Sequence, residues 1–396
     1  MSYTFELSKP LTDYGQALRE WSVAEVRPHA RQADTDHAPP SHWREVLDTC
    51  PVPLGRTHRK KLDPIPVFEE GRWVSELVYY ENLNYGDIWP LPLLNSNIGH
   101  LVVEASGTPD QVERWYRPAA ENGVIWSFAL TEPGFGSDTS QVATTARRDG
   151  DSWVLNGNKI YASNAAIAEF ITVFATVDKS QGAKGIRTFV VPRDAPGLTI
   201  TRSNEDKMGI RSWVTSAFSL EDCVLPLDHC IGLDSEGNAV APRSGQGAAL
   251  KALTNNRPNM AAIAVGLGQA AIDLTTDLLR EERAGFAPHR WSAIQDDLAR
   301  MNAALERARR VSFHAQALVD RGVPSAPASA TAKAYAPETV ERIIRRCMQL
   351  LGPDGTSQDL LLEKWYRDAK IIDIFEGTGQ IQRLVVARSV LGRLAG

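Results

Sequence analysis

Apolar residues change their spacing twice along this chain of 396 residues. From Leu11 to about Gly123, and again from about Gly245, they follow the three-to-four-residue spacing of amphipathic helices. Between these parts, short β-branched and aromatic segments separated by turn residues are typical of strands. Strands and helices do not alternate, which disfavours a doubly wound sheet. The order predicts an α+β multidomain protein, namely an N-terminal α-helical domain (1–123), a middle antiparallel β-barrel-like domain (124–232) and a C-terminal four-helix bundle (233–396).

Local signals add detail to this outline. Thr108 and Pro109 predict a helix start, as the N-cap and the first helical residue. Gly266 lies inside a helical pattern, so we expect close helix packing there and not a phosphate-binding turn. The stretch 56–66 is basic and contains proline, which predicts a loop. Tight turns are predicted at Asp149-Gly150, Asn156-Gly157 and Pro196-Gly197, the second of them as a hairpin.

Charge and cysteine content exclude several classes of function. The formal net charge is −5 and the basic residues are scattered, which is not the pattern of a nucleic-acid-binding protein. The four cysteines are far apart and form no CxxC pair, so we expect no metal site and a reduced, cytoplasmic protein. The first residues lack the features of a signal peptide. No apolar run approaches the roughly 20 residues of a membrane-spanning helix, so we expect no membrane association.

Three segments could bind a ligand. The Gly-rich stretch "FALTEPGFGSDTS" contains Thr131 and Ser137, and such turns can form anion-binding nests, although it could also be a plain loop between strands. Tyr161 and Ser163 fall on one face of a predicted strand and could flank a flat ring, or belong to an ordinary half-buried strand. Arg283, at a helix end, could pair with a phosphate or simply be solvated.

A fourth segment, "DIFEGTG", places Glu376 between apolar helix-like sequences, with no basic residue within three positions on either side. An apolar setting disfavours the charged carboxylate and raises its pKa, which suits a general base. Alternatively, Glu376 could cap the following helix, with Gly377 supplying the turn.

Taken together, these segments resemble the acyl-CoA dehydrogenase family of flavoproteins. The resemblance is specific at "TEPGFGSD", at "ERAGF…AIQ…LARM" and above all at "RDAKIIDIFEGTGQIQRL", and it extends over nearly the whole chain from about Tyr80. It implies the fold predicted above and FAD as the cofactor. In the middle domain it assigns FAD to Phe128, Leu130, Thr131, Gly136, Ser137, Tyr161 and Ser163.

The resemblance also implies roles for these residues. Thr131 would hydrogen-bond the pyrimidine side of the flavin, and Ser137 would reach the pyrophosphate. Tyr161 stands where the family usually has a tryptophan stacked on the flavin, and Ser163 where it usually has a threonine facing N5.

The remaining implied FAD contacts lie in the C-terminal part. Arg283 and the turn of Gln349 and Gly352 would reach the FAD of a neighbouring subunit. Thr378 and Gln380 would flank the adenine end. Sites shared between subunits imply a homo-oligomer, a dimer or a homotetramer.

By the same resemblance, Glu376 is the catalytic base. It would remove the pro-R α-proton of an acyl thioester while a hydride leaves the β-carbon for flavin N5, giving the trans-2-enoyl thioester. The backbone N–H of Glu376 and a ribityl hydroxyl would stabilise the enolate oxygen. The lack of a basic neighbour fits this role, because a Lys or Arg partner would lower the pKa of the base. The substrate contacts implied are Ser137, Asn256, Arg257 and Gly377.

Some family members place the base on the helix that begins "NNRPNM", but this chain has Asn256 there, so Glu376 is the better candidate. Trp213 occupies a position that is usually small. The bulky stretch Trp89-Pro90-Leu91-Pro92 predicts a narrow or short acyl pocket.

The implied setting is fatty acid metabolism, with an acyl thioester of coenzyme A or a carrier protein as substrate and an electron-transfer flavoprotein as acceptor. Two alternatives stay open. A flavin monooxygenase on the same fold would usually lack the glutamate, and a non-catalytic subunit of a hetero-oligomer would lack the glutamate or the FAD loops.

Overall fold

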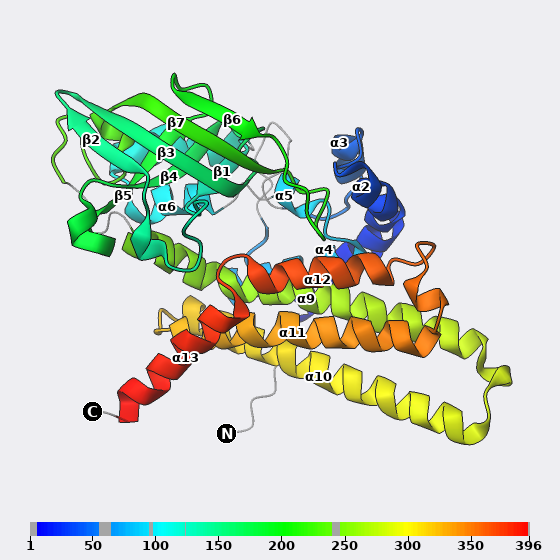
Figure 1. Cartoon of the computed structure of the whole chain (residues 1–396). Helices are drawn as coiled ribbons and strands as arrows, with labels where there is room; N and C mark the ends of the chain where they lie inside the picture. The colour runs from blue at the N-terminus through cyan, green and yellow to red at the C-terminus, as the bar shows by residue number, and fades with distance from the viewer. Residues whose placement is uncertain (1–5, 55–64, 95–97, 123, 240–245, 395–396) are drawn as a thin grey trace.

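The computed structural model describes residues 6–54, 65–94, 98–122, 124–239 and 246–394. The chain forms helices first, then a curled sheet, then a second set of helices (Figure 1). The predicted fold class is therefore confirmed. Most of stretch 56–66, predicted as a loop, lies outside the described residues.

Helices make up the N-terminal part. Thr108 caps one of them, as its sequence predicts: its hydroxyl accepts from the Gln111 N–H at 3.2 Å, and the Gln111 side chain accepts from the Thr108 N–H at 2.9 Å. This reciprocal capping box satisfies two backbone donors that the helix itself leaves free. The α-helices of this part are α1 (Lys9–Trp21), α2 (Ala30–Asp36), α3 (Trp43–Asp48), α4 (Arg72–Gly86), α5 (Leu91–Leu94), α6 (Gly99–Ser106), α7 (Pro109–Gln111) and α8 (Arg117–Asn122).

The middle part is a seven-stranded sheet in the described residues, ordered β1-β4-β2-β3-β7-β6, with β5 paired to β4. Most pairs are antiparallel, but β4 pairs in parallel with β1 and with β2, which the sequence did not reveal. The strands are β1 (Trp126–Ala129), β2 (Thr145–Asp149), β3 (Ser152–Ser163), β4 (Phe170–Thr176), β5 (Ile186–Pro192), β6 (Leu198–Arg202) and β7 (Thr215–Pro226).

Two of the three predicted turns are where the sequence places them. Gly150, at φ +57°, lies in the turn between β2 and β3, and Gly197, at φ +88°, precedes β6. The hairpin predicted at Asn156-Gly157 is wrong. These residues lie inside β3, at a register shift against β7. Gly157 is required there because a Cβ would come within 2.5 Å of the Thr144 hydroxyl, so the Asn-Gly pair marks a β-bulge and not a chain reversal.

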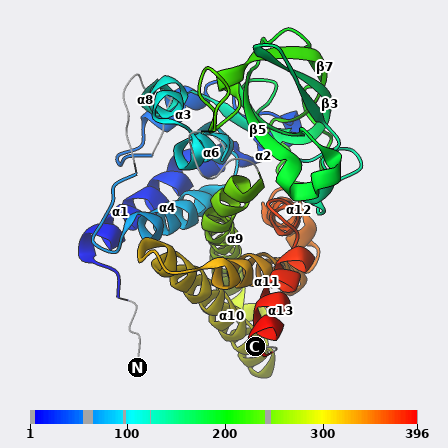
Figure 2. The same cartoon turned by 90° about the vertical axis from the view of Figure 1, so that its left-hand side faces the viewer.

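The C-terminal part consists of α9 (Gln246–Glu281), α10 (Pro288–Asp320), α11 (Ala326–Leu351), α12 (Leu362–Ile374) and α13 (Gly379–Leu394). α9 packs against α4, α10, α11 and α12, and α13 packs against α11 (Figures 1 and 2). Close packing at Gly266 is confirmed, because a Cβ there would lie 2.2 Å from the Glu81 carbonyl oxygen of α4. The predicted apolar stripe of α10 also faces inward, with Ile294, Met301, Leu305 and Ala308 buried.

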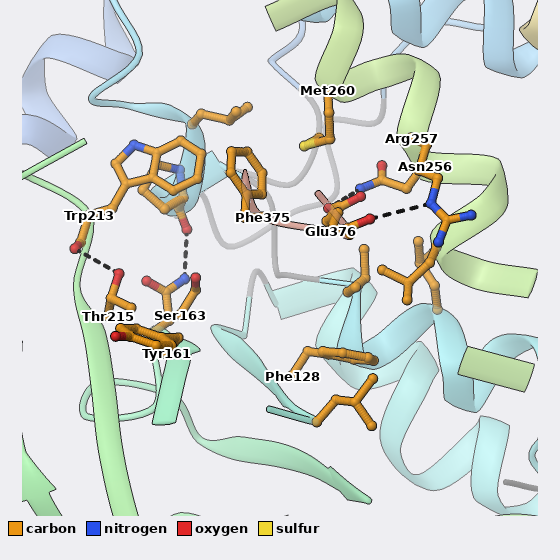
Figure 3. Close-up of a pocket in the computed structure, with 18 of the residues that line it drawn as sticks. Phe128, Tyr161, Ser163, Trp213, Thr215, Asn256, Arg257, Met260, Phe375 and Glu376 are labelled. Atoms are coloured by element: carbon orange, nitrogen blue, oxygen red, sulfur yellow. Dashed lines mark hydrogen bonds between the residues drawn. The ribbon is translucent and has the colours of Figure 1, made fainter. Parts of the chain in front are cut away.

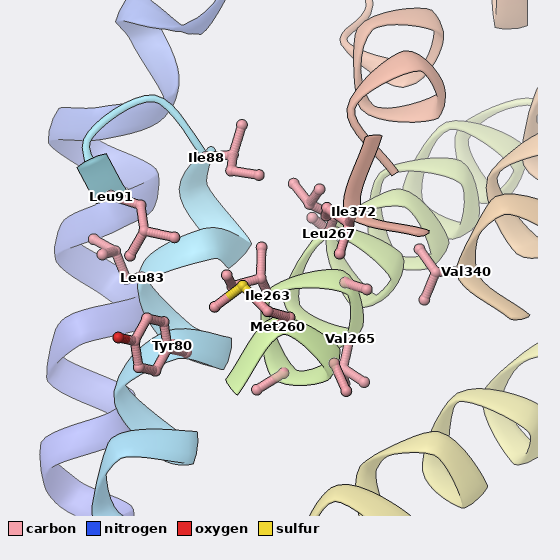
Figure 4. Close-up of a cluster of buried hydrophobic side chains, with 14 of the residues drawn as sticks. Tyr80, Leu83, Ile88, Leu91, Met260, Ile263, Val265, Leu267, Val340 and Ile372 are labelled. Carbon is pink, nitrogen blue, oxygen red and sulfur yellow. The ribbon is translucent and has the colours of Figure 1, made fainter. Parts of the chain in front are cut away.

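The N-terminal helices and the bundle share one apolar core. Figure 4 shows side chains from α4, α9, α11 and α12 meeting in this core. Its labelled members include Tyr80, Leu83, Ile263, Leu267, Val340 and Ile372, all of them buried. This shared core fixes α4, α9 and α12 relative to one another.

One segment of the described chain, Lys251–Glu281 of α9, is long and apolar enough by composition to cross a membrane. Two thirds of its most apolar stretch (67%) is buried inside the molecule. Its central place between four other helices accounts for that composition, because a helix that is packed all round is apolar all round.

Candidate active site

A cavity of about 1090 Å³ lies between the sheet, the N-terminal helices and the loop that joins α12 to α13. Its size is at the upper end for ligand sites, roughly 300–1,000 Å³. It brings together most of the site residues expected from the sequence. These are Phe128, Leu130, Thr131, Gly136, Ser137, Tyr161, Ser163, Asn256, Arg257, Glu376, Gly377 and Thr378.

Glu376 lines this cavity next to Asn256 and Arg257 (Figure 3). α12 ends at Ile374, and Glu376 then adopts φ +57°, a left-handed conformation that is costly for any residue other than glycine. Asn256 Nδ2 donates to Glu376 Oε1 at 2.7 Å. The other oxygen, Oε2, is buried and has no hydrogen-bond partner in the described part of the chain. The two carboxylate oxygens of Glu376 therefore differ, because Oε1 accepts a hydrogen bond and Oε2 accepts none within the described chain.

Burial raises the pKa of Glu376 to about 7. Lys333, the hydrogen bond from Asn256 and the charge of Arg257 oppose this rise. Arg257 also donates from Nε to the backbone oxygen of Glu376 at 3.3 Å. A carboxyl group with this pKa is partly ionised near neutral pH and can exchange a proton there.

The expectation that no cation lies near Glu376 is wrong. Lys333 of α11 is fully buried, and its Nζ donates to the carbonyl oxygens of Asp373 at 3.2 Å and Gly377 at 3.5 Å, on either side of Glu376. Burial lowers the pKa of Lys333 to about 8, although Glu376 opposes this shift. The local sequence around Glu376 could not reveal a neighbour from another helix.

A signal for Lys333 does exist in its own helix. Ala330, Lys333, Pro337 and Val340 are spaced three or four residues apart and are all buried. A lysine at an inward position of an apolar stripe indicates a buried cation, which must be paired or hydrogen-bonded.

The sheet forms the opposite wall of the cavity. Tyr161 adopts φ +53° where the pairing of β3 with β7 is irregular, and its side chain is 61% exposed. Ser163 also lines the cavity, and its backbone oxygen accepts from the Ser127 hydroxyl at 2.7 Å. A large aromatic ring left uncovered beside a cavity does not fit an ordinary half-buried strand. It leaves a flat apolar surface for a ring to stack on.

The Gly-rich stretch next to this wall is firmly anchored. Glu132 and Lys159 form a buried ion pair at 2.7 Å. Glu132 also accepts from the backbone N–H groups of Ala143 at 2.7 Å and Thr144 at 2.9 Å. These bonds anchor the stretch through Glu132, while Thr131, Gly136 and Ser137 line the cavity.

These features fit FAD. The ring of Tyr161 offers a stacking surface, and the hydroxyls of Thr131 and Ser137 have no partner within the described residues. A Cβ added at Gly134 would meet no atom within 4 Å, and one added at Gly136 would meet a single atom at 3.6 Å, so the backbone is open to a close approach. The described residues include no group of three or more His, Cys, Asp or Glu side chains placed to hold a metal ion.

Four of the expected site residues lie elsewhere. Arg283 follows the end of α9, where its guanidinium lies over the Trp291 ring, whereas Asn256 is near the start of that helix. At 1.5 Å per residue, about 40 Å of helix separates the two. Gln349 and Gly352 lie at the end of α11, about 24 Å along it from Lys333. Gln380 is exposed on α13. Within one chain, these four do not line the cavity.

Aromatic residues close the cavity on the other side of Glu376. Trp213 is 7% exposed, donates from its indole to the Ile88 carbonyl at 2.9 Å and lies 6.0 Å from the Phe375 ring in an edge-on arrangement (Figure 3). Leu91 and Pro92 line the cavity, as their bulk predicts.

Trp89 does not take part in this wall. It is fully buried, it donates to the Val26 carbonyl at 2.9 Å, and neither it nor Pro90 is among the cavity-lining residues. The expectation that these two fill the pocket is wrong, because the side chain of Trp89 packs among the N-terminal helices.

Known proteins resemble this chain over most of its length. The family model described as acyl-CoA dehydrogenase, middle domain, matches residues 127–223, and the one described as acyl-CoA dehydrogenase, C-terminal domain, matches residues 243–391. The chain is 41% identical over 382 residues to the mitochondrial short-chain specific acyl-CoA dehydrogenase of Bos taurus, covering 95% of this chain and 89% of that one.

Two solved structures are similar over the whole chain. One is butyryl-CoA dehydrogenase from Megasphaera elsdenii, with a TM-score of 0.85 and 27% identity, covering 98% of this chain and all of that one (100%). The other, described as an electron transferring flavoprotein of Acidaminococcus fermentans, has a TM-score of 0.85 and 29% identity over the same shares, 98% and 100%.

Proposed function

The chain belongs to the acyl-CoA dehydrogenase family, and from that premise we propose that it oxidises a short acyl-CoA to the trans-2-enoyl-CoA with Glu376 as the base. As a member of this family it is a flavin-dependent oxidoreductase of fatty acid metabolism.

The observation that carries the proposal is the state of Glu376 Oε2. This oxygen is buried and lacks a partner in the described chain, on a residue that lines the cavity opposite Tyr161 and Ser163. An unpartnered buried carboxylate oxygen is costly, which is best explained by a role that needs it free. With a pKa of about 7, Glu376 can take up the α-proton of a substrate placed between it and the sheet wall.

A base alone does not suffice, because the α-proton of a thioester is only weakly acidic. The enolate oxygen that develops needs hydrogen-bond donors. The backbone N–H of Glu376 has no acceptor among the described residues, and the left-handed conformation of Glu376 turns its backbone out of the helix. We assign this N–H to the thioester oxygen. FAD bound along Tyr161, Ser163 and Thr131 would supply the oxidising power by accepting the hydride from the β-carbon.

Two observations support a short acyl group. The relatives named above include a short-chain specific enzyme and a butyryl-CoA dehydrogenase. In addition, the bulky side chains of Trp213, Leu91 and Pro92 line the same cavity as Glu376.

The positions of Arg283, Gln349 and Gly352 support a homo-oligomer, a dimer or a tetramer, in which one subunit completes the FAD site of the next. We further propose an electron-transfer flavoprotein as the electron acceptor, which membership of this family implies. The four cysteines are free and buried, in line with a location in the cytoplasm.

An anaerobic titration of the purified protein tests this proposal. We expect bound FAD, and bleaching of its absorbance band by butyryl-CoA but much less by long-chain acyl-CoA thioesters. A protein that binds FAD but is not bleached by any acyl-CoA would contradict the proposal. Rapid reaction of the reduced protein with oxygen to hydroxylate a substrate would favour the monooxygenase alternative.

A further inference from the structure

We infer that Asn259 is a positioning residue for the base, Glu376. The amide of Asn259 is held by Glu76 and Gln316. It imposes one orientation on the amide of Asn256, which can then only donate to Glu376 Oε1. This inference rests on the proposed function, since it concerns how the proposed base is held. It adds residues of α4, α9 and α10 that do not contact the reacting atoms.

The orientation of an amide side chain is fixed only where its partners cannot exchange donor and acceptor roles. At one end of this chain of bonds, the hydrogen bond from Asn259 to Glu76 meets this condition. Asn259 Nδ2 donates to Glu76 Oε2 at 3.1 Å, and an ionised carboxylate can only accept. Arg72 Nε holds the other oxygen of Glu76 at 3.1 Å, which favours the ionised form.

The other end is equally unambiguous. Gln316 Nε2 donates to the backbone carbonyl of Asn255 at 3.1 Å, and a carbonyl can only accept. The same nitrogen donates to Asn259 Oδ1 at 2.7 Å. The amide of Asn259 is therefore oriented from both sides, with its nitrogen toward Glu76 and its oxygen toward Gln316.

The fixed orientation of the Asn259 amide also determines which atom of Asn256 faces Glu376. Asn259 Nδ2 has a second hydrogen, which it donates to Asn256 Oδ1 at 3.2 Å. The nitrogen of Asn256 then faces Glu376 Oε1, at 2.7 Å. Asn259 and Gln316 are fully buried, so water does not compete for their hydrogen-bond donors and acceptors. The result is that Oε1 is always an acceptor, and Oε2 is the oxygen left for the substrate's proton.

Loss of this orientation would change the ionisation of the base. If the Asn256 amide could turn, its oxygen would face Glu376 for part of the time and favour the protonated carboxyl group. Other charges around Glu376 would stay in place. Lys333 of α11 and Arg257 of α9 act on Glu376 directly, and Asp373 of α12 acts on Lys333. The Arg72–Glu76 pair of α4 and the residues Asp206 and Lys207 line the same cavity, and Arg383 of α13 pairs with Glu338.

The test is a double-mutant cycle on the FAD-bound protein, read by infrared titration of the carboxyl stretch of Glu376. The band is assigned by its loss in Glu376→Gln. We expect Asn256→Leu to raise the pKa of Glu376 by about one unit, since hydrogen bonds to charged groups are the stronger ones. Asn259→Leu should raise it by a similar amount, and the double variant by no more than Asn256→Leu alone.

The matched control is Asn255→Leu, the same change on the same helix at a side chain with no hydrogen bond among the described residues. It should leave the titration unchanged. Additive shifts in the double variant, or no shift in Asn259→Leu, would overturn the inference.

If Asn259→Leu does not fold, the near-isosteric Asn259→Asp replaces it in the cycle. The negative charge of the introduced aspartate would raise the pKa of Glu376 whether or not Asn256 is present. Only the part of the pKa shift that is seen with Asn256 and is lost in the Asn256→Leu background therefore reports the positioning role of Asn259. A shift of equal size in both backgrounds would refute the inference. The titration needs no substrate, so it stays informative even if the protein oxidises no acyl-CoA.

Discussion

Asn256 donates a hydrogen bond of 2.7 Å to Oε1 of Glu376, a residue 120 positions further along the chain. This bond distinguishes the two oxygens of the carboxylate, because Oε2 stays buried without a partner in the described chain. Activity should therefore depend on the state of this carboxylate and on the walls of the cavity around it.

The pH dependence of activity should report Glu376. Its pKa is raised to about 7, mainly by burial, and a general base acts only when it is deprotonated. We therefore expect kcat/KM for butyryl-CoA to be level well above pH 7 and to fall about tenfold per pH unit well below it. A profile that stays level down to pH 5 would mean that the base has an ordinary carboxyl pKa.

Lys333→Met should move that acidic limb to higher pH. Lys333 is the largest influence that opposes the raised pKa of Glu376, so its loss leaves the effect of burial less opposed. Lys370→Met is the matched control, because Lys370 is a partly exposed lysine that pairs with Glu341. Profiles of kcat/KM against pH for both variants are the measurement. A limb that does not move in Lys333→Met would reduce Lys333 to a structural role.

Trp213→Leu should widen the range of substrates. The indole of Trp213 occupies the cavity wall near Phe375, and each methylene accommodated in an apolar pocket is worth about 1–3 kcal/mol. We expect the ratio of kcat/KM for octanoyl-CoA over butyryl-CoA to rise at least about tenfold.

Trp89→Leu controls for this change. Trp89 is also buried and also donates to a backbone carbonyl, but it does not line the cavity. It should lose stability, on the order of a few kcal/mol for a large-to-small core change, with no change in the ratio of substrates. Equal shifts in the two variants would show that general loosening, and not the pocket wall, sets the acyl length.

Arg283→Gln should weaken FAD binding without changing the fold of the subunit. Arg283 is remote from the cavity of its own chain, and its proposed partner is the FAD of the neighbouring subunit. Loss of one charged contact to a phosphate corresponds to roughly tenfold or more in the dissociation constant. Arg280→Gln, on the exposed last turn of α9, should leave the constant unchanged. The dissociation constant of FAD is measured for the two variants by equilibrium titration of the assembled oligomers. Equal constants in the two variants would contradict the proposed contact of Arg283.

The sequence predicted the fold well because periodicity is a local property. The apolar stripe of α10, the capping box at Thr108 and the turns at Gly150 and Gly197 depend on residues close together in the chain. The hairpin at Asn156-Gly157 failed because the bulge there is decided by pairing with β7, more than sixty residues away.

In the site, too, local features could be predicted from the sequence and contacts between distant segments could not. The resemblance gave residues that line the cavity, including Tyr161, Ser163 and Glu376. It could not give Lys333 or Asn259, because their influence on Glu376 arises from helix packing. It also placed Trp89 in the pocket wrongly, since the direction of a side chain around a helix start depends on what packs beside it.

The most direct test of the account is anaerobic mixing of Glu376→Gln with an acyl-CoA that bleaches the wild-type flavin. Glutamine keeps the shape of the side chain and an oxygen to accept from Asn256, but it cannot take up the α-proton. The variant should fold, bind FAD and bind the thioester, while the bleaching rate falls by about 10⁴-fold, the upper end for general-base catalysis. Bleaching at a rate comparable to that of the wild type would show that Glu376 is not the base.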